Sequence, residues 1–532
     1  MNIYMKKEII FSLMALSVAA AGAQTVYDAT AIAQKELNGT ARFVGMGGAM
    51  GALGGDISTI GTNPAGIGIY RSNDAMLTLG YSVIGTESNY LGQTAEQNKY
   101  RWGLDNAGVV ISNKIGNHTA LRYLNFGFNY HKTKSLYKNM TMQGMMGAFD
   151  NEFLSQTHSM AQQGTASAFD YGRDDLFYNN NAGWLSGLGY QGWLTGKDEE
   201  TANSYFSYIP DEAFGYYGAR ERGGIDQYDF NISFNVNDRF YFGFTVGAYD
   251  VDYYKNSLWS ESYGTDEGYD VNSYNRIHGT GIDAKFGVIF RPIETSPLRI
   301  GLSVHTPTFY QLTYTTGARL ISDVLMEREE NGQVTTAMER YDVNTLDYLD
   351  GRDMDRDFEL CTPWVFNASL GYTVGNYLAL GAEYEYEDYS SMKFNYPDGG
   401  EMMWETGEAD LCMKGVSTLR LGAEYKPIPA FSMRLGYNYS SSAFKEDAIK
   451  ALPSNSINTD TDFANTNSMN TFTLGIGYRG SLLYADLAYK YDMYKSDFYP
   501  FYNEMGDYLV TPEATKVTNS RSKVMLTVGV RF

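Results

Sequence analysis

The residues best able to do chemistry are few and widely spaced. The chain has five histidines, His118, His131, His158, His278 and His305. None of them shows H-x-x-x-H or another metal-ligand spacing, and no G-x-S-x-G nucleophile elbow occurs. The carboxylate clusters near Glu327 and Asp353 are typical of solvated loops. We therefore expect no catalytic site, no metal and no cofactor; an enzyme built on scattered residues is the alternative that this leaves open.

Composition and charge narrow the class of protein further. The 532 residues include 41 Lys and Arg against 62 Asp and Glu, so the formal charge is −21 and the isoelectric point lies near 4.7. Such acidity argues against nucleic acid as a partner. Aromatic residues make up 15% of the chain, which excludes a disordered chain and requires a structure that seats many aromatic side chains.

The N-terminus predicts export. Lys6 and Lys7 precede a mostly apolar run, and Ala21-Gly22-Ala23 matches the small-x-small pattern of a cleavage site. We expect residues 1–23 to be a signal peptide and the mature chain to begin at Gln24. No later stretch is apolar for the roughly 18 residues that a membrane helix needs, so only strands could cross a membrane.

Alternating apolar and polar residues predict such strands. The clearest case runs from Lys523 to the terminal Phe532, where apolar Val524, Leu526 and Val528 alternate with polar or small residues. Similar or weaker patterns predict strands near residues 75–83, 107–114, 121–132, 228–236, 240–246, 280–291, 298–304, 365–375, 378–386, 419–425, 431–439, 471–479 and 482–492. The total of about 14 is even, as bacterial outer-membrane barrels require.

The lengths of the connections support a barrel that spans a membrane. Links at 114–117, 237–238, 292–297, 374–376, 427–430 and 480–481 are short, while most of the others are long. The longest runs from about 133 to 224. Short periplasmic turns and long extracellular loops produce this alternation. We predict an all-β fold, a transmembrane antiparallel β-barrel over residues 73–532.

The segment before the first strand is different. Residues 39–72 are too rich in glycine for a strand and too irregular for a helix, so this segment could lie inside the barrel. A phosphate-binding loop is the alternative, but neither G-x-G-x-x-G nor G-x-x-x-x-G-K-[ST] occurs in it. We set residues 24–72 apart from the barrel strands as an N-terminal segment.

With these features, the chain resembles the FadL/TodX family of outer-membrane transporters for long-chain fatty acids and other hydrophobic compounds. The resemblance is carried by Gly45 to Gly48 and Asn63-Pro64-Ala65, by GIDAKFGVIFRPIETSPLRIGLSVHTP at 281–307, by the strand ending EYEDYS at 385–390, and by LRLGAEYKPIPAFSMRLGYNY at 419–439. The chain is longer than a typical member, and its connection at 133–224 matches no motif.

The resemblance implies passive uptake in the outer membrane by a monomer surrounded by lipid. A hydrophobic compound would be captured outside, enter the lumen and leave sideways into the bilayer when an N-terminal hatch, residues 24–72, shifts. Asn63, Pro64 and Ala65 would belong to this hatch, either as a gate or as a structural plug turn. The terminal Phe532 would be presented to the barrel-assembly machinery.

Two further groups of residues are candidates for binding the ligand. Met145, Phe149 and Phe153 have helical i, i+4, i+8 spacing and could form an apolar capture stripe, or else the private core of the long loop. Strand alternation turns several arginines inward, among them Arg299, Arg420 and Arg434. A fatty-acid carboxylate would need an unpaired one, while paired arginines would be struts.

The predicted topology brings Cys361 and Cys412 to the same outer rim, just before two strand starts with a single strand between them. Neighbouring strands lie about 4.8 Å apart, so a disulfide could close this gap. Two free thiols are the alternative.

Three classes of function stay open. A transporter would be favoured by an apolar tunnel that ends at a break in the wall. A secretion-accessory or surface-anchoring barrel that docks another protein would be favoured by a lumen filled with paired charges. An enzyme is the third class.

Overall fold

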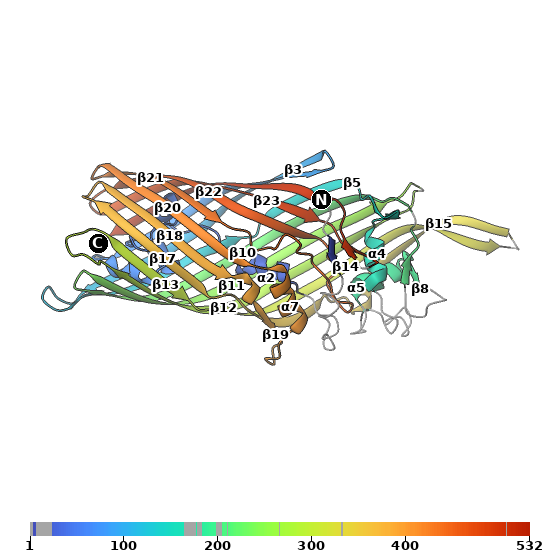
Figure 1. The fold of residues 1–532 in the computed structure, drawn as a ribbon, viewed down its shortest axis with the longest axis horizontal. Helices are drawn as coiled ribbons and strands as arrows, with labels where there is room; N and C mark the ends of the chain where they lie inside the picture. Colours follow the sequence, from blue (N-terminus) through green and yellow to red (C-terminus); the bar gives the residue numbers. More distant parts are fainter. Residues whose placement is uncertain are drawn as a thin grey trace.

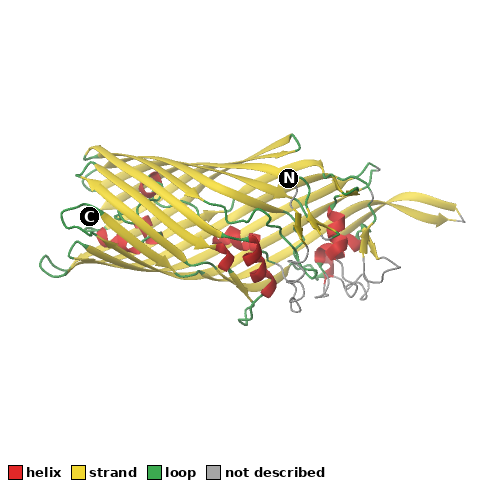
Figure 2. Ribbon diagram, viewed as in Figure 1, coloured by secondary structure: helices red, strands yellow, loops and turns green. Residues whose placement is uncertain are grey.

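The computed structural model describes residues 4–6, 24–163, 177, 183–197, 205–209, 211–264, 266–330, 333–506 and 508–532. Most of these residues are in strands, and long strands tilt around a single barrel (Figures 1 and 2). No helix in the described ranges is long and apolar enough to cross a bilayer.

A closed wall of 14 antiparallel strands forms the barrel. In order around the wall they are β2 (Asp74–Tyr90), β3 (Gln93–Lys114), β4 (Leu121–Ser135), β10 (Phe214–Val236), β11 (Phe240–Ser262), β12 (Gly268–Phe290), β13 (Arg299–His305), β17 (Val365–Val374), β18 (Leu378–Asp388), β20 (Gly415–Ile428), β21 (Phe431–Ser440), β22 (Phe463–Arg479), β23 (Leu483–Tyr499) and β26 (Thr515–Arg531). The last strand pairs with the first from Asp74↔Arg531 to Asn89↔Lys516, which closes the ring. The predicted number of strands is confirmed.

Alternation along each strand sorts side chains between the outer face and the lumen. On β22, Leu474 and Ile476 are 56% and 55% exposed on the outer face, whereas Thr471 and Thr473 are each 1% exposed. The same sorting holds for Val524, Leu526 and Val528 on β26, which are all exposed. An apolar outer face and a polar interior are the arrangement of a barrel that stands in lipid.

The outer half of the wall contains strands that alternation did not predict. They are β5 (Lys138–Met145), β14 (Phe309–Glu330), β15 (Gln333–Asn344), β16 (Met354–Cys361) and β19 (Lys393–Asn395). Prolines mark two of the joints between lower and upper strands: Pro307 lies between β13 and β14, and Pro363 lies between β16 and β17. Because proline has no N–H to donate, it interrupts the ladder at these places.

The outer loops fold over the mouth of the barrel. Their elements are β6 (Ala148–Phe149), β7 (Glu152–Phe153), α4 (Gln156–Gln163), α5 (Trp184–Gln191), β8 (Thr195–Lys197), β9 (Tyr205–Ser207), α6 (Thr345–Tyr348), η4 (Tyr389–Ser391), α7 (Met403–Cys412), β24 (Asn503–Met505) and β25 (Tyr508–Val510). They bury a large cluster of aromatic and methionine side chains together with the inner face of the upper wall. Residues 4–6, within the predicted signal peptide, form β1 (Tyr4–Lys6) and pair with β25.

The N-terminal segment, residues 24–73, runs through the lumen. It contains α2 (Val26–Ala33), α3 (Ala41–Gly45), η1 (Ile57–Gly61) and η2 (Pro64–Ile69). Helix α2 starts at the capping box of Thr25 and Asp28, and Thr40 caps α3. Nearly all of the segment is buried, and Figure 2 shows its short helices enclosed by the strands.

Candidate functional site

A row of inward-facing glycines lets the N-terminal segment pack directly on the wall. The row consists of Gly371, Gly381, Gly422 and Gly436, which are direct partners on β17, β18, β20 and β21. A Cβ built on Gly381 would overlap the carbonyl oxygen of Ala49, and one built on Gly422 would overlap that of Met46. Only glycine permits such an approach of backbone to backbone. The row therefore fixes where residues 45–51 lie.

The Asn63-Pro64-Ala65 turn is anchored to the opposite wall. The side chain of Asn63 accepts from the Ala65 N–H at 3.1 Å and donates to the Val288 carbonyl at 3.3 Å. The Ser233 hydroxyl donates to the Pro64 carbonyl at 2.9 Å. Pro64 stands at the first position of η2, where its missing N–H costs nothing. The polar side chains thus satisfy backbone groups that are buried in the lumen; a gating role for this turn stays a prediction.

Ion pairs among wall residues, and between the wall and the N-terminal segment, line the lumen. Glu424 accepts from Arg42 of the segment at 3.0 Å and from Arg434 at 2.7 Å, and Arg434 also binds Asp486 at 2.6 Å. On the other side, Lys285 lies 2.8 Å from Asp283 and 3.3 Å from Asp229. Their charges are compensated within the lumen, so these groups act as struts rather than as ligand sites.

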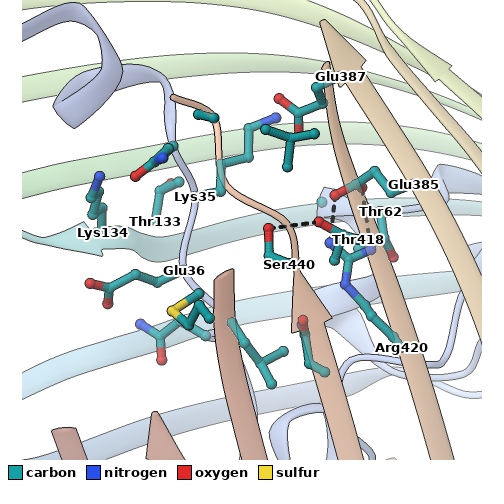
Figure 3. A pocket seen from close by; sticks show the side chains of 18 of the residues that line it. Lys35, Glu36, Thr62, Thr133, Lys134, Glu385, Glu387, Thr418, Arg420 and Ser440 are labelled. Carbon is teal, nitrogen blue, oxygen red and sulfur yellow. Dashed lines mark hydrogen bonds and ion pairs between the residues drawn. The ribbon is translucent and has the colours of Figure 1, made fainter. Parts of the chain in front are cut away.

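Two polar cavities lie on either side of residues 34–36. The inner one has a volume of about 220 Å³ and is lined by Lys35, Glu385, Glu387 and Arg420 among others (Figure 3). The outer one measures about 230 Å³ and shares Gln34, Glu36, Lys134, Thr466 and Tyr494 with it. Residues 34–36 of the N-terminal segment therefore separate the two cavities.

Lys35 is the cation in the inner cavity that stands apart. Its side chain is exposed to the inner cavity and makes no hydrogen bond or ion pair among the residues that the structure describes, although it interacts electrostatically with the carboxylates of Glu385 and Glu387 across the cavity. By contrast, Arg420 is held at 2.6 Å by both Glu383 and Glu385. Sequence reasoning looked for the cation on the strands and missed Lys35, because an isolated lysine in an irregular segment gives no pattern.

The backbone ladder between β3 and β4 is interrupted beside the inner cavity. The β3–β4 ladder ends at Asn106↔His131, although both strands continue outward. Above that point β3 pairs only with β2, while β4 leads into β5, which pairs with β10. His131, Thr133 and Lys134 line the cavity just beyond the last pair. The backbone ladder is thus continuous below this level and interrupted above it, where the side chains of Ser88, Tyr90 and Gln97 hydrogen-bond to β5.

The three arginines predicted to face inward differ in their binding partners. Arg420 and Arg434 are paired with carboxylates, as expected of struts. Arg299 instead donates to the carbonyl of Leu53 at 2.7 Å, at the short-turn end of the barrel. Arg420 and Arg434 are therefore not free to bind a fatty-acid carboxylate, and Arg299 does not line the inner cavity.

The predicted helical stripe of Met145, Phe149 and Phe153 is wrong in its secondary structure. Met145 ends β5, and the two phenylalanines belong to the β6–β7 hairpin, so the three side chains share no helical face. The first helix of this connection, α4, begins only at Gln156. Hydrogen bonding of β5 to β10 overrides the local spacing. Met145 and Phe153 are still partly exposed, so a role in capture stays a prediction.

The predicted disulfide is not formed, because both thiols are free. Cys361 is not in a rim loop but ends β16, where it pairs with Phe309 and Lys393. Cys412 ends α7 and is buried, with its sulfur 3.5 Å from the Ile449 carbonyl oxygen. Burial raises the pKa of the Cys412 thiol. The two residues lie in different layers of the outer half, which the count of strands could not reveal.

A buried carboxyl joins the first helix to the outer loops. Glu408 of α7 accepts from the N–H groups of Val26 and Ala451, each at 3.4 Å. It is buried, and burial raises its pKa to about 8. The neighbouring Glu405 has its pKa raised to about 7 for the same reason. No group of three His, Cys, Asp or Glu side chains among the described residues is placed to hold a metal ion.

Comparison with known proteins identifies the fold. No protein-family model matches the chain, and no curated protein matches it. Among solved structures, a FadL homologue from Pseudomonas aeruginosa is 14% identical, with a TM-score of 0.50 over 94% of this chain and 99% of that one. The toluene transporters TodX of Pseudomonas putida and TbuX of Ralstonia pickettii are 10% and 12% identical, with TM-scores of 0.47 and 0.46 over 94% and 93% of this chain and 99% of theirs. The chain thus shares the fold of the FadL homologue, an outer-membrane barrel, as the sequence resemblance predicted.

Proposed function

We propose that this protein is an outer-membrane channel for the passive uptake of hydrophobic compounds. The observation that carries the proposal is the interruption of the backbone ladder between β3 and β4, beside which β4 lines the inner cavity. A water-filled pore offers nothing to an apolar solute, but a side exit lets it pass into lipid without exposing its surface to water again, at about 25 cal/mol per Å². Capture would take place in the outer loops and release at this interruption.

Within this class, the cavities favour a compound that carries an anionic head. Their linings are polar as well as aromatic, and Lys35 offers an ammonium group that makes no ion pair among the described residues and interacts with Glu385 and Glu387 only at longer range. A long-chain fatty acid would place its carboxylate there and its chain toward the interruption. An uncharged hydrocarbon would leave the polar lining unsatisfied.

The proposal requires the N-terminal segment to move, and a reversible tether tests this. A Cβ built on Gly45 would stand 3.3 Å from Cα of Gly475 on β22, so cysteines at these two positions can form a disulfide. In a background with Cys361 and Cys412 changed to Ser, we expect G45C/G475C cells to take up a fluorescent fatty acid several-fold more slowly when oxidised. Reductant should restore the rate.

The matched controls are the two single-cysteine variants, whose uptake should not respond to oxidant. Gel mobility of the oxidised protein reports whether the bond has formed. Equal uptake with the bond closed and open would refute a moving hatch.

A surface-anchoring barrel is the second candidate, and one observation favours it. The ion pairs around Arg42, Lys285 and Arg420 line the lumen with compensated charge, as a structural core would. In that case the outer loops would bind another protein and the lumen would transport nothing. The tether would then change neither uptake nor the binding of that protein.

A further inference from the structure

The two ends of the barrel carry opposite charge. The end with the short turns comprises residues 70–74, 111–122, 237–239, 290–299, 374–378, 425–431, 478–483 and 529–532. It has nine cationic side chains, Arg71, Lys114, Arg122, Arg239, Arg291, Arg299, Lys426, Arg479 and Arg531, and three acidic ones, Asp74, Asp238 and Glu294. Its formal charge is therefore +6, in a chain whose total is −21.

Most of the rim cations are not neutralised by carboxylates. Arg239 donates to the carbonyls of Arg291 and Pro292, each at 3.1 Å, and Arg291 donates to the carbonyls of Glu294 and Ser296. Arg479 has no carboxylate within ion-pair distance in the described part of the chain and lies 5.5 Å from the ring of Tyr484. In the lumen, by contrast, Arg42, Arg420 and Arg434 each form an ion pair with a carboxylate.

Several of these cations surround the mouth rather than face the lipid. On β22 the outward position is taken by Tyr478, so the next residue, Arg479, turns toward the mouth. Arg531 binds Asp74 at 2.7 Å and lies 5.8 Å from the ring of Tyr70, where the N-terminal segment leaves the lumen. Arg71 lies on this same exit and pairs with Asp238 of the β10–β11 turn at 2.9 Å.

We propose that this cationic mouth docks an acidic soluble protein of the periplasm. Short turns mark the periplasmic end of such barrels, so the ring faces that compartment. Opposite charges steer association and set orientation. An acidic partner is repelled by the rest of the molecule, which carries −27, and is therefore drawn to this end alone.

The probe for this surface is a fluorescent peptide of twelve glutamates, added to the full-length protein in phosphatidylcholine nanodiscs. We expect saturable binding in low salt that weakens at least five-fold when salt is raised from 50 to 300 mM, a change that screening of exposed charges predicts. Changing three rim cations, in R71Q/R239Q/R479Q, should weaken it at least five-fold. The matched control K99Q/K393Q/K414Q removes the same charge from the outer end and should not weaken it.

Two further measurements make the result decisive. Lysine at the same three rim positions keeps the charge and should restore binding, which separates charge from local structure. Preference for phosphatidylglycerol over phosphatidylethanolamine, measured by native mass spectrometry, tests lipid headgroups instead. If the rim variant loses that lipid preference while its affinity for the peptide is unchanged, or if the peptide does not bind the wild type, the acidic-protein proposal is overturned.

Discussion

At the scale of single residues, the glycines of the wall determine how closely the N-terminal segment can pack. We expect Gly381→Ala to push residues 45–51 off the wall, because its methyl group would overlap the Ala49 carbonyl oxygen. Overpacking of this kind costs about 1–3 kcal/mol. Hydrogen exchange of residues 45–51 should become faster, and thermal unfolding should begin earlier. Gly103→Ala is the matched control, since a Cβ there would meet no atom of the described residues within 4 Å; equal effects of the two changes would contradict the argument.

The same glycines show what a single sequence cannot reveal. Leu-Gly-Ala and Leu-Gly-Tyr triplets are visible in the predicted strands, at Gly381, Gly422 and Gly436. That the three glycines are neighbours depends on the register between strands, which alternation along one strand does not determine. Asn63 was predictable because its turn chemistry is local. Lys35 was not, because its isolation depends on what surrounds it.

At the scale of elements, the contact between α2 and α7 should depend on pH. Glu408 has a folded pKa of about 8, raised by burial from 4.5. A carboxyl whose pKa is raised favours the folded state in its protonated form, so its contribution is fully present below pH 4.5 and is lost as the pH rises through 8. The pKa of nearby Glu405 is also raised by burial, whereas the charge of Lys450 lowers the pKa of Glu408. We therefore expect α2 to loosen above pH 8.

The variant Glu408→Gln isolates this group. It keeps the shape of the side chain and removes the titration, so the difference in melting temperature between E408Q and the wild type should grow in favour of E408Q from pH 6 to pH 9. Hydrogen exchange of residues 26–33 locates the effect. A difference that stays constant over this range would show that Glu408 does not titrate near 8.

Alternation in the sequence predicts the halves of the strands near the short turns but not the halves near the outer loops. On β10, the alternation at residues 228–236 reflects lipid on one face and the lumen on the other. Residues 214–227 of the same strand extend to where the outer loops cover the inner face, and the apolar residues Tyr217, Ala219 and Ile225 face inward there. Side chains still alternate between the two faces of the strand, but the apolar ones lie on the inner face here and on the outer face at residues 228–236. The spacing of Met145, Phe149 and Phe153 predicts a helix, but Met145 is in a strand because β5 is hydrogen-bonded to β10.

At the scale of the whole molecule, both proposals depend on which end of the barrel faces the outside of the cell. The interruption between β3 and β4 and the capture loops must lie toward the outside, and the cationic mouth must face the periplasm. Two turns in the described part of the chain can report this. Gly92 is at the tip of the β2–β3 hairpin, with a φ of +87° and open space around the position that a Cβ would take, and Asn237 is in the β10–β11 turn, with a φ of +57°.

A protease site inserted after Gly92 should be cut on intact cells, whereas one inserted after Asn237 should be cut only after the outer membrane is permeabilised. Neither insertion interrupts a ladder, because each residue lies between two paired strands. Gly164, in the long connection that the sequence places outside, lies beyond the described residues, so Gly92 serves as the outer site. Both sites can be compared at equal surface abundance by heat-dependent gel mobility of the barrel. Cleavage at Asn237 alone on intact cells would show that the barrel has the opposite orientation, with the cationic ring at the cell surface, and would remove the basis for a periplasmic partner. Cleavage at both sites would contradict the membrane-spanning arrangement itself.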